Sequence, residues 1–360
     1  MPVSTKKFED SSELESIFAG MNFEKVRSIS LSGNSYSIEA CKWLAENVVS
    51  KMTNVSVVNF SDMFTSRLKT DIPLALVNLM DALMDKEVVS LNVRDNAFGP
   101  IGVESLAKFL SSTTSLKILN VSNCGLGPKG SSMIAEYLLA NNTVMLTEFH
   151  ACRSKLEQDG MNAMAEVFLK QRSLQVIDVS QCGSKWGLRK LFEALTECKE
   201  LRHVNVNDNH INKAIPQLKS FLENVNSNLE YLNISNLNMK KKNCKIISEV
   251  LIESIKNSKI KDLSWDYDLN CSTSTAQEFL TNFAEIENCP VERLSMIGVF
   301  NDRKNRHEVR SLFKQCQTNI TLFKPDYTDE ESEERDASEE ESQEEESSSA
   351  SEKQEYSDND

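Results

Sequence analysis

One short loop carries the residue that could act most directly on a charged partner. In the stretch FTSRLKTDIP, Phe64 to Pro73, Arg67 stands in a polar run between a strand-like segment and a helix start. An arginine inserted into a partner's site can neutralise negative charge that develops in a transition state. Spacing alone leaves a plainer interpretation open, in which Arg67 is a surface residue paired with Asp71 four positions later. Choosing between a functional arginine and a surface ion pair requires knowing which helices and strands position the loop.

No catalytic or metal-binding motif accompanies this arginine. The chain lacks GxxxxGK[ST], GxSxG, HExxH and a GxGxxG that follows a strand. The four histidines are dispersed, and we expect His203 on an exposed strand face rather than acting as a base. Nine cysteines form no CxxC and no Cys/His cluster, which indicates a reduced intracellular protein. We therefore expect no catalytic site, no metal and no cofactor belonging to the chain itself.

A repeat supplies the frame for the loop. Apolar residues at i, i+3 and i+5 recur in ten registers, with successive starts 27 to 33 residues apart, and the units fit LxxLxLxxN of leucine-rich repeats. The registers start at Val26, Val55, Val88, Leu116, Leu146, Leu174, Leu201, Leu229, Ile260 and Val291. Each holds a short alternating strand followed by an amphipathic helix, as in 103–115. The sequence predicts an α/β horseshoe of ribonuclease-inhibitor-like long repeats, with parallel strands inside and helices outside.

The residue that ends each strand motif is assigned a structural role. An Asn or Cys there bonds backbone groups that would otherwise be buried unpaired between neighbouring turns. We assign this ladder role to Asn34, Asn96, Cys124, Cys182 and Asn209. Repeats after Leu229 are less regular, and the stretch 265–277 gives up the asparagine of the ladder.

The chain divides into a cap, a repeat domain and a tail. Repeat stacks need capped ends, so residues 1–25 are expected to form an N-terminal cap and 26–324 the repeats, closed by a segment at 307–316. Residues 329–360 hold sixteen acidic residues against Arg335 and Lys353, a net charge of −14. The rest holds 54 − 16 = 38 acidic and 40 − 2 = 38 basic residues and is neutral. We expect 325–360 to be a disordered acidic tail, either a solubiliser or an aid in binding a basic partner.

Neither nucleic acid nor a membrane is an expected partner. The net charge of −14 repels nucleic acid. No apolar run approaches the ~18 to 20 residues that a helix needs to cross a bilayer. The repeat architecture instead predicts that a large protein partner binds the concave face or the edge where strands pass into helices.

Loop residues that the ladder does not need are candidates for that contact. Asn123 precedes the ladder residue Cys124, and Asp62, Asp95 and Asp208 take the same place in their own repeats. Stacked repeats would align these side chains in a polar row along one edge. Arg67 follows in the longest unit, of 33 residues, and extra length in a repeat maps to its loop. A second turn-stabilising role remains open for Asn123.

Several of these stretches together resemble one family. FSDMFTSRLKTDIPLALVNLMDAL (60–83), VRDNAFGP (93–100) and SNCGLGP (122–128) resemble the Ran GTPase-activating proteins, most closely over residues 26–140. The acidic tail matches the layout of that family, and the chain is similar to its compact, fungal-type members. Ser154 and Lys155 depart from the pattern, since the family commonly has Asn and Arg there, which puts contacts at these two positions in doubt.

The resemblance implies a partner and a mechanism. It implies a monomeric regulator, not itself an enzyme, that stimulates GTP hydrolysis by Ran in its GTP form, together with a Ran-binding protein. GTP and magnesium would be held by the GTPase. The arginine that the family requires falls on Arg67, and the asparagine that contacts the active-site region of Ran falls on Asn123. Lys69, Asp95 and Asp208 fall on loop positions that touch Ran.

The resemblance also implies how and where the chain acts. The family orders the GTPase's own catalytic residues and does not supply an arginine finger. Arg67 would then anchor the switch surface of Ran, and Asn123 would hold the catalytic geometry. Activation of this kind supports nucleocytoplasmic transport from the cytoplasm, the perinuclear cytoplasm included.

Two other functions remain open. A non-catalytic scaffold, or an inhibitor of the ribonuclease-inhibitor kind, would share the repeat length, but the neutral body and the FTSRLK stretch argue against it. An acidic-tailed nuclear protein that binds histones would share the tail. Such proteins have shorter repeats, nearer ~24 residues, than the spacing of 27 to 33 found in this chain.

Overall fold

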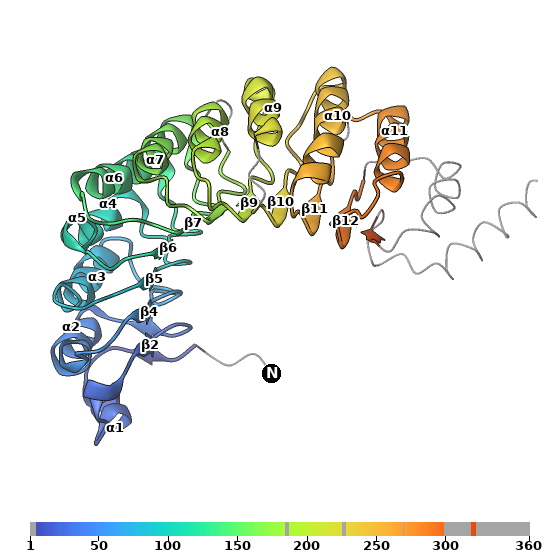
Figure 1. Ribbon diagram of the computed structural model, residues 1–360. Helices are drawn as coiled ribbons and strands as arrows, with labels where there is room; N and C mark the ends of the chain where they lie inside the picture. The colour runs from blue at the N-terminus through green and yellow to red at the C-terminus, as the bar shows by residue number, and fades with distance from the viewer. Residues whose placement is uncertain (1–4, 184–186, 225–227, 269, 299–317, 322–360) are drawn as a thin grey trace, which may run out of the picture.

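The strands of the repeats form one continuous parallel sheet. The computed structural model describes residues 5–183, 187–224, 228–268, 270–298 and 318–321. In these residues, eleven strands pair in the order β13-β12-β11-β10-β9-β8-β7-β6-β5-β4-β2, so neighbours in sequence are neighbours in space. Figure 1 shows the stack curving into an arc, with the strands on its inner side and the helices outside. The predicted leucine-rich repeat horseshoe is confirmed.

Each strand is three residues long and lies where the LxL motif predicts it. The strands are β2 (Ser28–Ser30), β4 (Val57–Asn59), β5 (Ser90–Asn92), β6 (Ile118–Asn120), β7 (Glu148–His150), β8 (Val176–Asp178), β9 (His203–Asn205), β10 (Tyr231–Asn233), β11 (Asp262–Ser264), β12 (Arg293–Ser295) and β13 (Asn319–Thr321). Central residues pair with central residues, as Leu91 does with Leu119. Since side chains alternate, the buried central residue faces the helices and its two neighbours face the concave side.

The helices carry the other half of the core. They are α1 (Ser12–Phe18), α2 (Ile38–Asn47), α3 (Asp71–Asp81), α4 (Gly99–Val103), α5 (Ala107–Ser112), α6 (Gly127–Ala140), α7 (Glu157–Gln171), α8 (Leu188–Thr196), α9 (Ile215–Glu223), α10 (Lys241–Asn257) and α11 (Thr273–Ala284). Their apolar stripes pack on the strands; Phe149 of β7 and Phe168 of α7, for example, lie 5.4 Å apart. None of the helices in the described residues is both long and apolar enough to cross a membrane.

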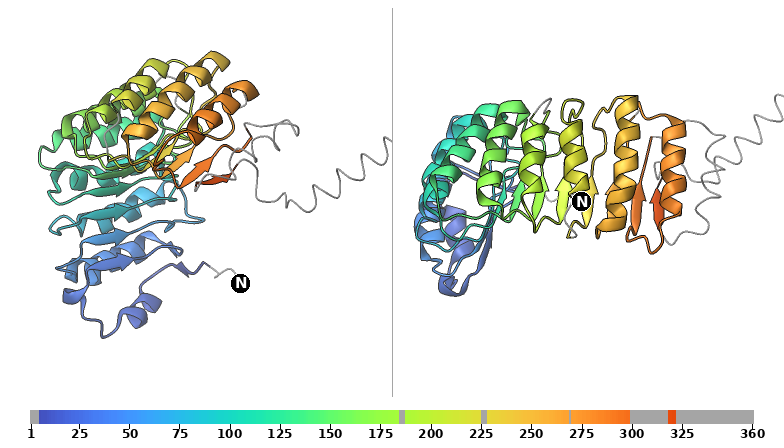
Figure 2. Two further views of the ribbon diagram at one scale, coloured as in Figure 1. Left: turned by 45° about the vertical axis from the view of Figure 1, so that its right-hand side comes forward. Right: turned by 45° about the horizontal axis from the view of Figure 1, so that its top comes forward.

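A small separate sheet covers the N-terminal end of the stack. The strand β1 (Lys7–Phe8) pairs in parallel with β3 (Ser35–Tyr36), which follows β2 in the first repeat. Phe8 stacks on Tyr36 with ring centroids 5.1 Å apart, and Leu14 of α1 is buried. Figure 2 shows this end, coloured blue, at the opposite end of the stack from the last strands of the large sheet. The expected C-terminal closure at 307–316 and the acidic tail at 325–360 lie outside the described residues.

Candidate functional site

The residue that ends each strand motif bonds backbone carbonyls across two repeats. Asn96 donates through Nδ2 to the carbonyls of Phe60 (2.7 Å) and Val93 (2.9 Å), and its Oδ1 accepts the amide of Met63. Asn209 donates to Val179 O and Val206 O in the same way. The thiols of Cys124 and Cys182 donate to Val93 O and Ala151 O, each at 3.1 Å. These four side chains satisfy buried polar backbone between turns.

Three further residues occupy this register in other ways. Asn34 serves the N-terminal sheet, since its Oδ1 accepts the amide of Lys6 at 3.2 Å. Ser154, at the departure from the family pattern, donates to Val121 O at 2.8 Å. In the stretch 265–277, where the ladder asparagine is missing, Asp268 occupies the ladder position. It accepts hydrogen bonds from the amide of Met239 and the indole N–H of Trp265. The ladder therefore continues there through a carboxyl group.

Asp268 is an ill-matched member of the ladder. Asn96 and Asn209 donate to carbonyl groups at this position, whereas an ionised carboxylate can only accept. Burial raises the pKa of Asp268 to about 6, against the hydrogen bonds from Met239 and Trp265 that lower it. The charged form of this side chain is therefore disfavoured in the fold.

The residues that precede the ladder positions form one continuous edge, which we call the edge row. It contains Asp62, Asp95, Asn123, Arg153, Gln181, Asp208 and Asn236, all with left-handed φ values between 47° and 62°. The backbone amide of every member but the last donates to the carbonyl of the residue before the next member, as Asn123 N does to Cys152 O at 2.7 Å. Asn and Asp adopt this backbone conformation more easily than other non-glycine residues. Their recurrence in the edge row thus has a conformational cause as well as any functional one.

Asn123 does not face outward unattached, as the sequence suggested. Its Nδ2 donates to Asp95 Oδ1 at 2.9 Å, and Asp95 Oδ2 accepts from Arg94 Nε at 2.6 Å. Burial would raise the pKa of Asp95, but the hydrogen bonds from Asn123 and Arg94 outweigh it, and the pKa lies below its usual value. The bond to the Asp95 carboxylate determines which end of the Asn123 amide is nitrogen and which is oxygen. Asn123 is exposed, and its Oδ1 accepts no hydrogen bond from any described residue.

Asp208 lies farther along the edge row, beyond the repeats of Arg153 and Gln181, and is not joined to Asn123. Its Oδ1 accepts from Asn236 Nδ2 at 3.0 Å. The pair Asp208–Asn236 therefore repeats the geometry of Asp95–Asn123 at a second place in the stack.

Arg67 points back toward the N-terminal sheet and is only 14% exposed. Its Nε donates to Ser35 Oγ (2.9 Å), one terminal nitrogen donates to Glu9 (2.6 Å), and the other to the carbonyls of Phe8 and Ser35 (3.2 Å each). The pKa of Glu9 is lowered, chiefly by the hydrogen bond from Arg67. The pairing with Asp71 that spacing left open is replaced by one with Glu9, to which no sequence signal pointed.

A cavity of about 190 Å³ lies beside the guanidinium of Arg67. Its lining includes Tyr36 and Phe64 together with the acidic residues Glu39 and Asp71, which lie in the first turns of α2 and α3. Lys69, by contrast, is exposed on the same loop and stands away from this lining. Arg67 thus has a buried setting and Lys69 a solvent-facing one.

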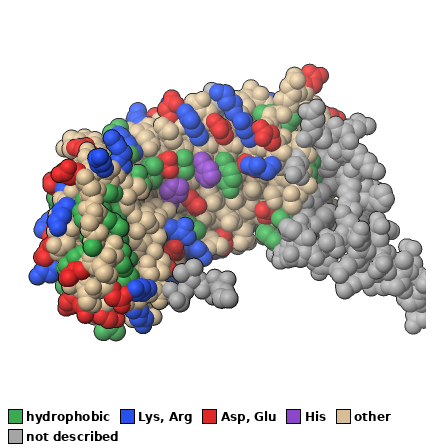
Figure 3. Space-filling view, turned by 90° about the horizontal axis from the view of Figure 1, so that it is seen from below, with side chains coloured by type: hydrophobic (Ala, Val, Ile, Leu, Met, Phe, Trp, Pro, Cys, Tyr) green, Lys and Arg blue, Asp and Glu red, His purple; other side chains and the backbone are tan. Residues whose placement is uncertain are grey.

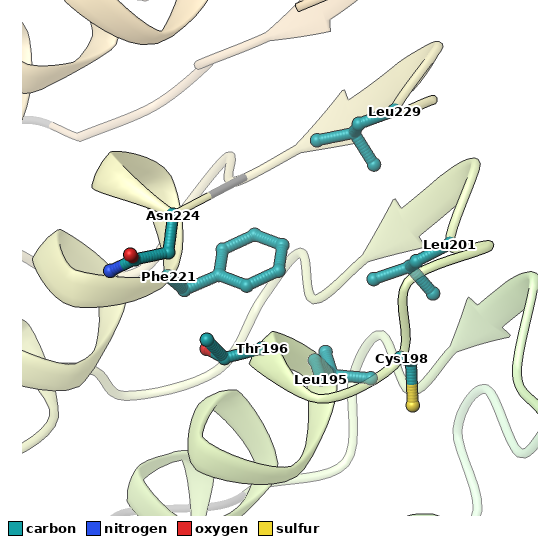
Figure 4. Close-up of a pocket in the computed structure, with 7 residues that line it drawn as sticks. All are labelled: Leu195, Thr196, Cys198, Leu201, Phe221, Asn224 and Leu229. Atoms are coloured by element: carbon teal, nitrogen blue, oxygen red, sulfur yellow. The ribbon is translucent and has the colours of Figure 1, made fainter. Parts of the chain in front are cut away.

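A second, much smaller space is a packing gap. It measures about 10 Å³ and is lined by Leu195, Thr196, Cys198, Leu201, Phe221, Asn224 and Leu229. Figure 4 shows the Phe221 ring directed toward the strands. A space of this size holds at most about one water molecule. It is not a ligand site.

A row of Asn and Asp side chains on the concave face escaped the sequence interpretation. Asn59, Asn92, Asn120, Asp178, Asn205 and Asn233 end their strands, and each accepts the amide two residues later. They also connect neighbouring strands, as Asn92 does with Asn59 at 3.1 Å. The signal was present in the recurring Asn of LNV, one place after the central residue of each strand. These residues stabilise the turns that carry the edge row.

The centre of the concave face is mixed in character. His203 stacks on Tyr231 with ring centroids 3.9 Å apart, and burial lowers the pKa of His203. Figure 3 shows histidines near the middle of this face, with acidic, basic and apolar side chains interspersed around them. Among the described residues, no group of three or more His, Cys, Asp or Glu side chains could hold a metal ion.

Comparison with known proteins agrees with the leucine-rich repeats. A family model described as Leucine Rich repeat matches residues 88–107 and 113–135. Ran GTPase-activating protein 1 of Xenopus laevis is 33% identical over 192 residues, 50% of this chain and 33% of that protein. Ran GTPase-activating protein 1 of Saccharomyces cerevisiae is 31% identical over 224 residues, 56% of this chain and 54% of that protein. The Ran GTPase-activating protein of Drosophila melanogaster is 33% identical over 168 residues, 43% of this chain and 28% of that protein.

The aligned regions thus span between about a quarter and about half of the length of these relatives. Within that span, three animal and fungal proteins carry the same type of name. With the repeat register and the parallel sheet, these matches show a leucine-rich repeat fold and a similarity to the Ran GTPase-activating proteins.

Proposed function

We propose that this chain stimulates GTP hydrolysis by the small GTPase Ran. The observation that carries the proposal is the similarity, at 31% to 33% identity, to curated Ran GTPase-activating proteins from three organisms. The geometry supports it, because the first repeats place Arg67, Lys69, Asp95 and Asn123 on loops at one edge of a rigid stack. The edge row then presents Asp208 to the same side of the molecule.

We further propose that the chain orders catalytic groups of Ran and inserts no arginine finger. Small GTPases hydrolyse GTP slowly because the water-orienting glutamine is poorly held. Asn123 supports this route, since Asp95 fixes its amide so that Oδ1 can accept a hydrogen bond from a partner. Arg67 supports it as well, because four hydrogen bonds within the chain already occupy its guanidinium. The loop 65–70 would meet the GTPase with Lys69.

The remaining elements of the proposal concern the setting of the reaction. GTP and magnesium belong to Ran, whose GTP form is the one recognised, and a Ran-binding protein takes part. The chain acts as a monomer and has no catalytic site of its own. It works in the cytoplasm, the perinuclear cytoplasm included, and so supports nucleocytoplasmic transport.

The test is single-turnover hydrolysis of GTP on Ran with catalytic amounts of this protein. We expect acceleration by several orders of magnitude, on the scale of the roughly 10³- to 10⁵-fold that an arginine finger supplies in other GTPase systems. The same assay with a GTPase of another family serves as the specificity control. If Ran hydrolyses GTP no faster with the protein than without it, the proposal is wrong.

A further inference from the structure

The loop between β4 and α3 has one inward face and one outward face. Phe64 is buried, Arg67 is largely buried, and the other residues of 65–70 are exposed. Leu68 is 68% exposed, the highest value among the large apolar side chains of the described residues. A partner that covered Leu68 would gain free energy from the burial of this apolar side chain.

Packing alone does not hold this loop in place. The cavity of about 190 Å³ lies next to Arg67, between the N-terminal sheet and the first turns of α2 and α3. A cavity leaves the atoms that line it without close neighbours on one side. Hydrogen bonds therefore have to supply much of the restraint, and those of Arg67 reach farthest from the loop.

Arg67 connects three segments of the chain. Ser35 Oγ accepts from Arg67 Nε and itself donates to Thr65 O at 2.8 Å, so one hydroxyl holds both the loop backbone and the guanidinium. Glu9 accepts from Arg67, and the backbone carbonyl of Glu9 accepts from Ser37 Oγ at 2.6 Å. Ser37 caps the N-terminus of α2 by accepting the amide of Ala40. The loop is thus tied to the cap and to the first repeat.

Resting on the proposed function, we infer that Arg67 acts as a positioning residue, and that Glu9 and Ser35 hold it so that Leu68 and Lys69 meet the GTPase. Arg67 cannot reach a partner without giving up contacts to Glu9, Ser35 and Phe8, and a charge-assisted hydrogen bond is costly to break. Glu9 of the N-terminal cap thereby becomes part of the activating machinery.

A loosened loop predicts a particular kinetic signature. The partner would have to order the loop when it binds, which weakens binding without changing chemistry in the bound complex. A cap that merely destabilised the fold would instead lower the fraction of active protein. That change would reduce the apparent kcat and leave KM for Ran-GTP as it was.

The first experiment compares Glu9→Gln with Glu13→Gln. Glu13 lies in the same cap and pairs with Lys6, so it is a matched control away from the loop. We expect Glu9→Gln to raise KM for Ran-GTP by about tenfold with kcat unchanged, in line with the loss of one charge-assisted hydrogen bond. Glu13→Gln should behave as wild type. An unchanged or lower KM for Glu9→Gln, or a fall in kcat alone, would overturn the inference.

The second experiment is a double-mutant cycle with direct-contact controls. If Glu9 acts through Arg67, the double variant Glu9→Gln/Arg67→Ala should match Arg67→Ala alone. Leu68→Ala should raise KM, whereas Leu169→Ala, an exposed leucine of α7, should not. Additive effects of Glu9 and Arg67, or a silent Leu68→Ala, would show that Arg67 contacts the GTPase itself.

Hydrogen exchange separates this inference from the proposed function. The amides of Arg67 and Asp71 bond Phe64 O and Leu68 O within the loop. We expect both to exchange faster in Glu9→Gln than in wild type or Glu13→Gln, and equal rates would contradict the role of Glu9 in holding the loop. Wild-type protein that fails to activate Ran would refute the proposed function, while this measurement would still test whether Glu9 holds the loop.

Discussion

Two places in the edge row share one geometry and differ in their surroundings. Asp95 accepts from Asn123 at 2.9 Å, and Asp208 accepts from Asn236 at 3.0 Å. All four residues have left-handed φ. Only the Asp95–Asn123 pair follows the repeat that carries Arg67 and its long loop. The pair is therefore a property of the repeat, and the proposed contact with Ran distinguishes the two places only by their position along the stack.

The ladder shows the same contrast between the two ends. Asn96 satisfies three backbone groups with a neutral amide, while Asp268 occupies the equivalent place with a carboxyl group whose pKa is raised. The N-terminal repeats combine regular turns with an added loop, and the later repeats carry a poorly matched buried group. The first region is suited to rigid presentation of side chains. The second region should be sensitive to pH.

The largest effect is expected at Arg67. Replacing it by alanine removes four hydrogen bonds and frees the loop 65–70, which should cost ~2 to 5 kcal/mol of complex or transition-state stability. We expect kcat/KM for Ran to fall roughly 30-fold or more. Arg172→Ala, an exposed arginine beyond α7, is the control. Activity close to wild type in Arg67→Ala would show that the N-terminal repeats do not depend on Arg67 to activate Ran.

The next effect concerns Asp268 and the stability of the later repeats. Its pKa is 3.8 in a reference state and about 6 in the fold, so folding favours the protonated form. The contribution of Asp268 to the unfolding free energy should be fully present below about pH 4 and should be lost as the pH rises to about 6, by roughly 3 kcal/mol at most. Denaturant unfolding across this range measures it.

Asp268→Asn should abolish that pH dependence. Glu287→Gln, at an exposed position nearby, should leave it in place. Persistence of the full dependence in Asp268→Asn would mean that another group is responsible, and the contrast between the ladder ends would lose its physical basis.

A smaller effect tests the two pairs of the edge row directly. Asn123→Ala and Asn236→Ala remove the same hydrogen bond and place alanine in the same left-handed conformation, so their costs in stability should be similar. Activation of Ran should fall about tenfold or more in Asn123→Ala and remain near wild type in Asn236→Ala. Equal losses in the two variants would show that the partner covers the whole edge row.

The smallest effect is expected from the acidic tail. Deletion of residues 329–360 removes a net charge of −14 but none of the loops described above. Hydrolysis at saturating Ran should stay intact, while association with a basic partner slows at low salt because electrostatic steering is lost. Stopped-flow binding at two salt concentrations measures the difference. Loss of hydrolysis at saturating Ran would assign the tail a direct role.

Local patterns were sufficient for the fold and for much of the edge row. The repeated LxL spacing specifies which side chains are buried. Stacking the repeats is the way to bury them in one continuous core, so the positions of the strands and helices could be predicted from the sequence. Asp95, Asn123 and Asp208 were found because they hold one register position. Their left-handed backbone was not foreseen, although the recurrence of Asn and Asp there is its signature.

What the sequence determined by itself is the repeat: its register, its parallel strands, its helices and the loop that carries Arg67. These features depend on residues that are close together in the chain, so their spacing can be read directly from the sequence. The tertiary structure decided the partner of Arg67. Glu9 lies 58 positions away, and no periodicity links it to the loop. The parallel pairing of β1 with β3 brings the two together, and that pairing depends on the burial of Phe8 against Tyr36.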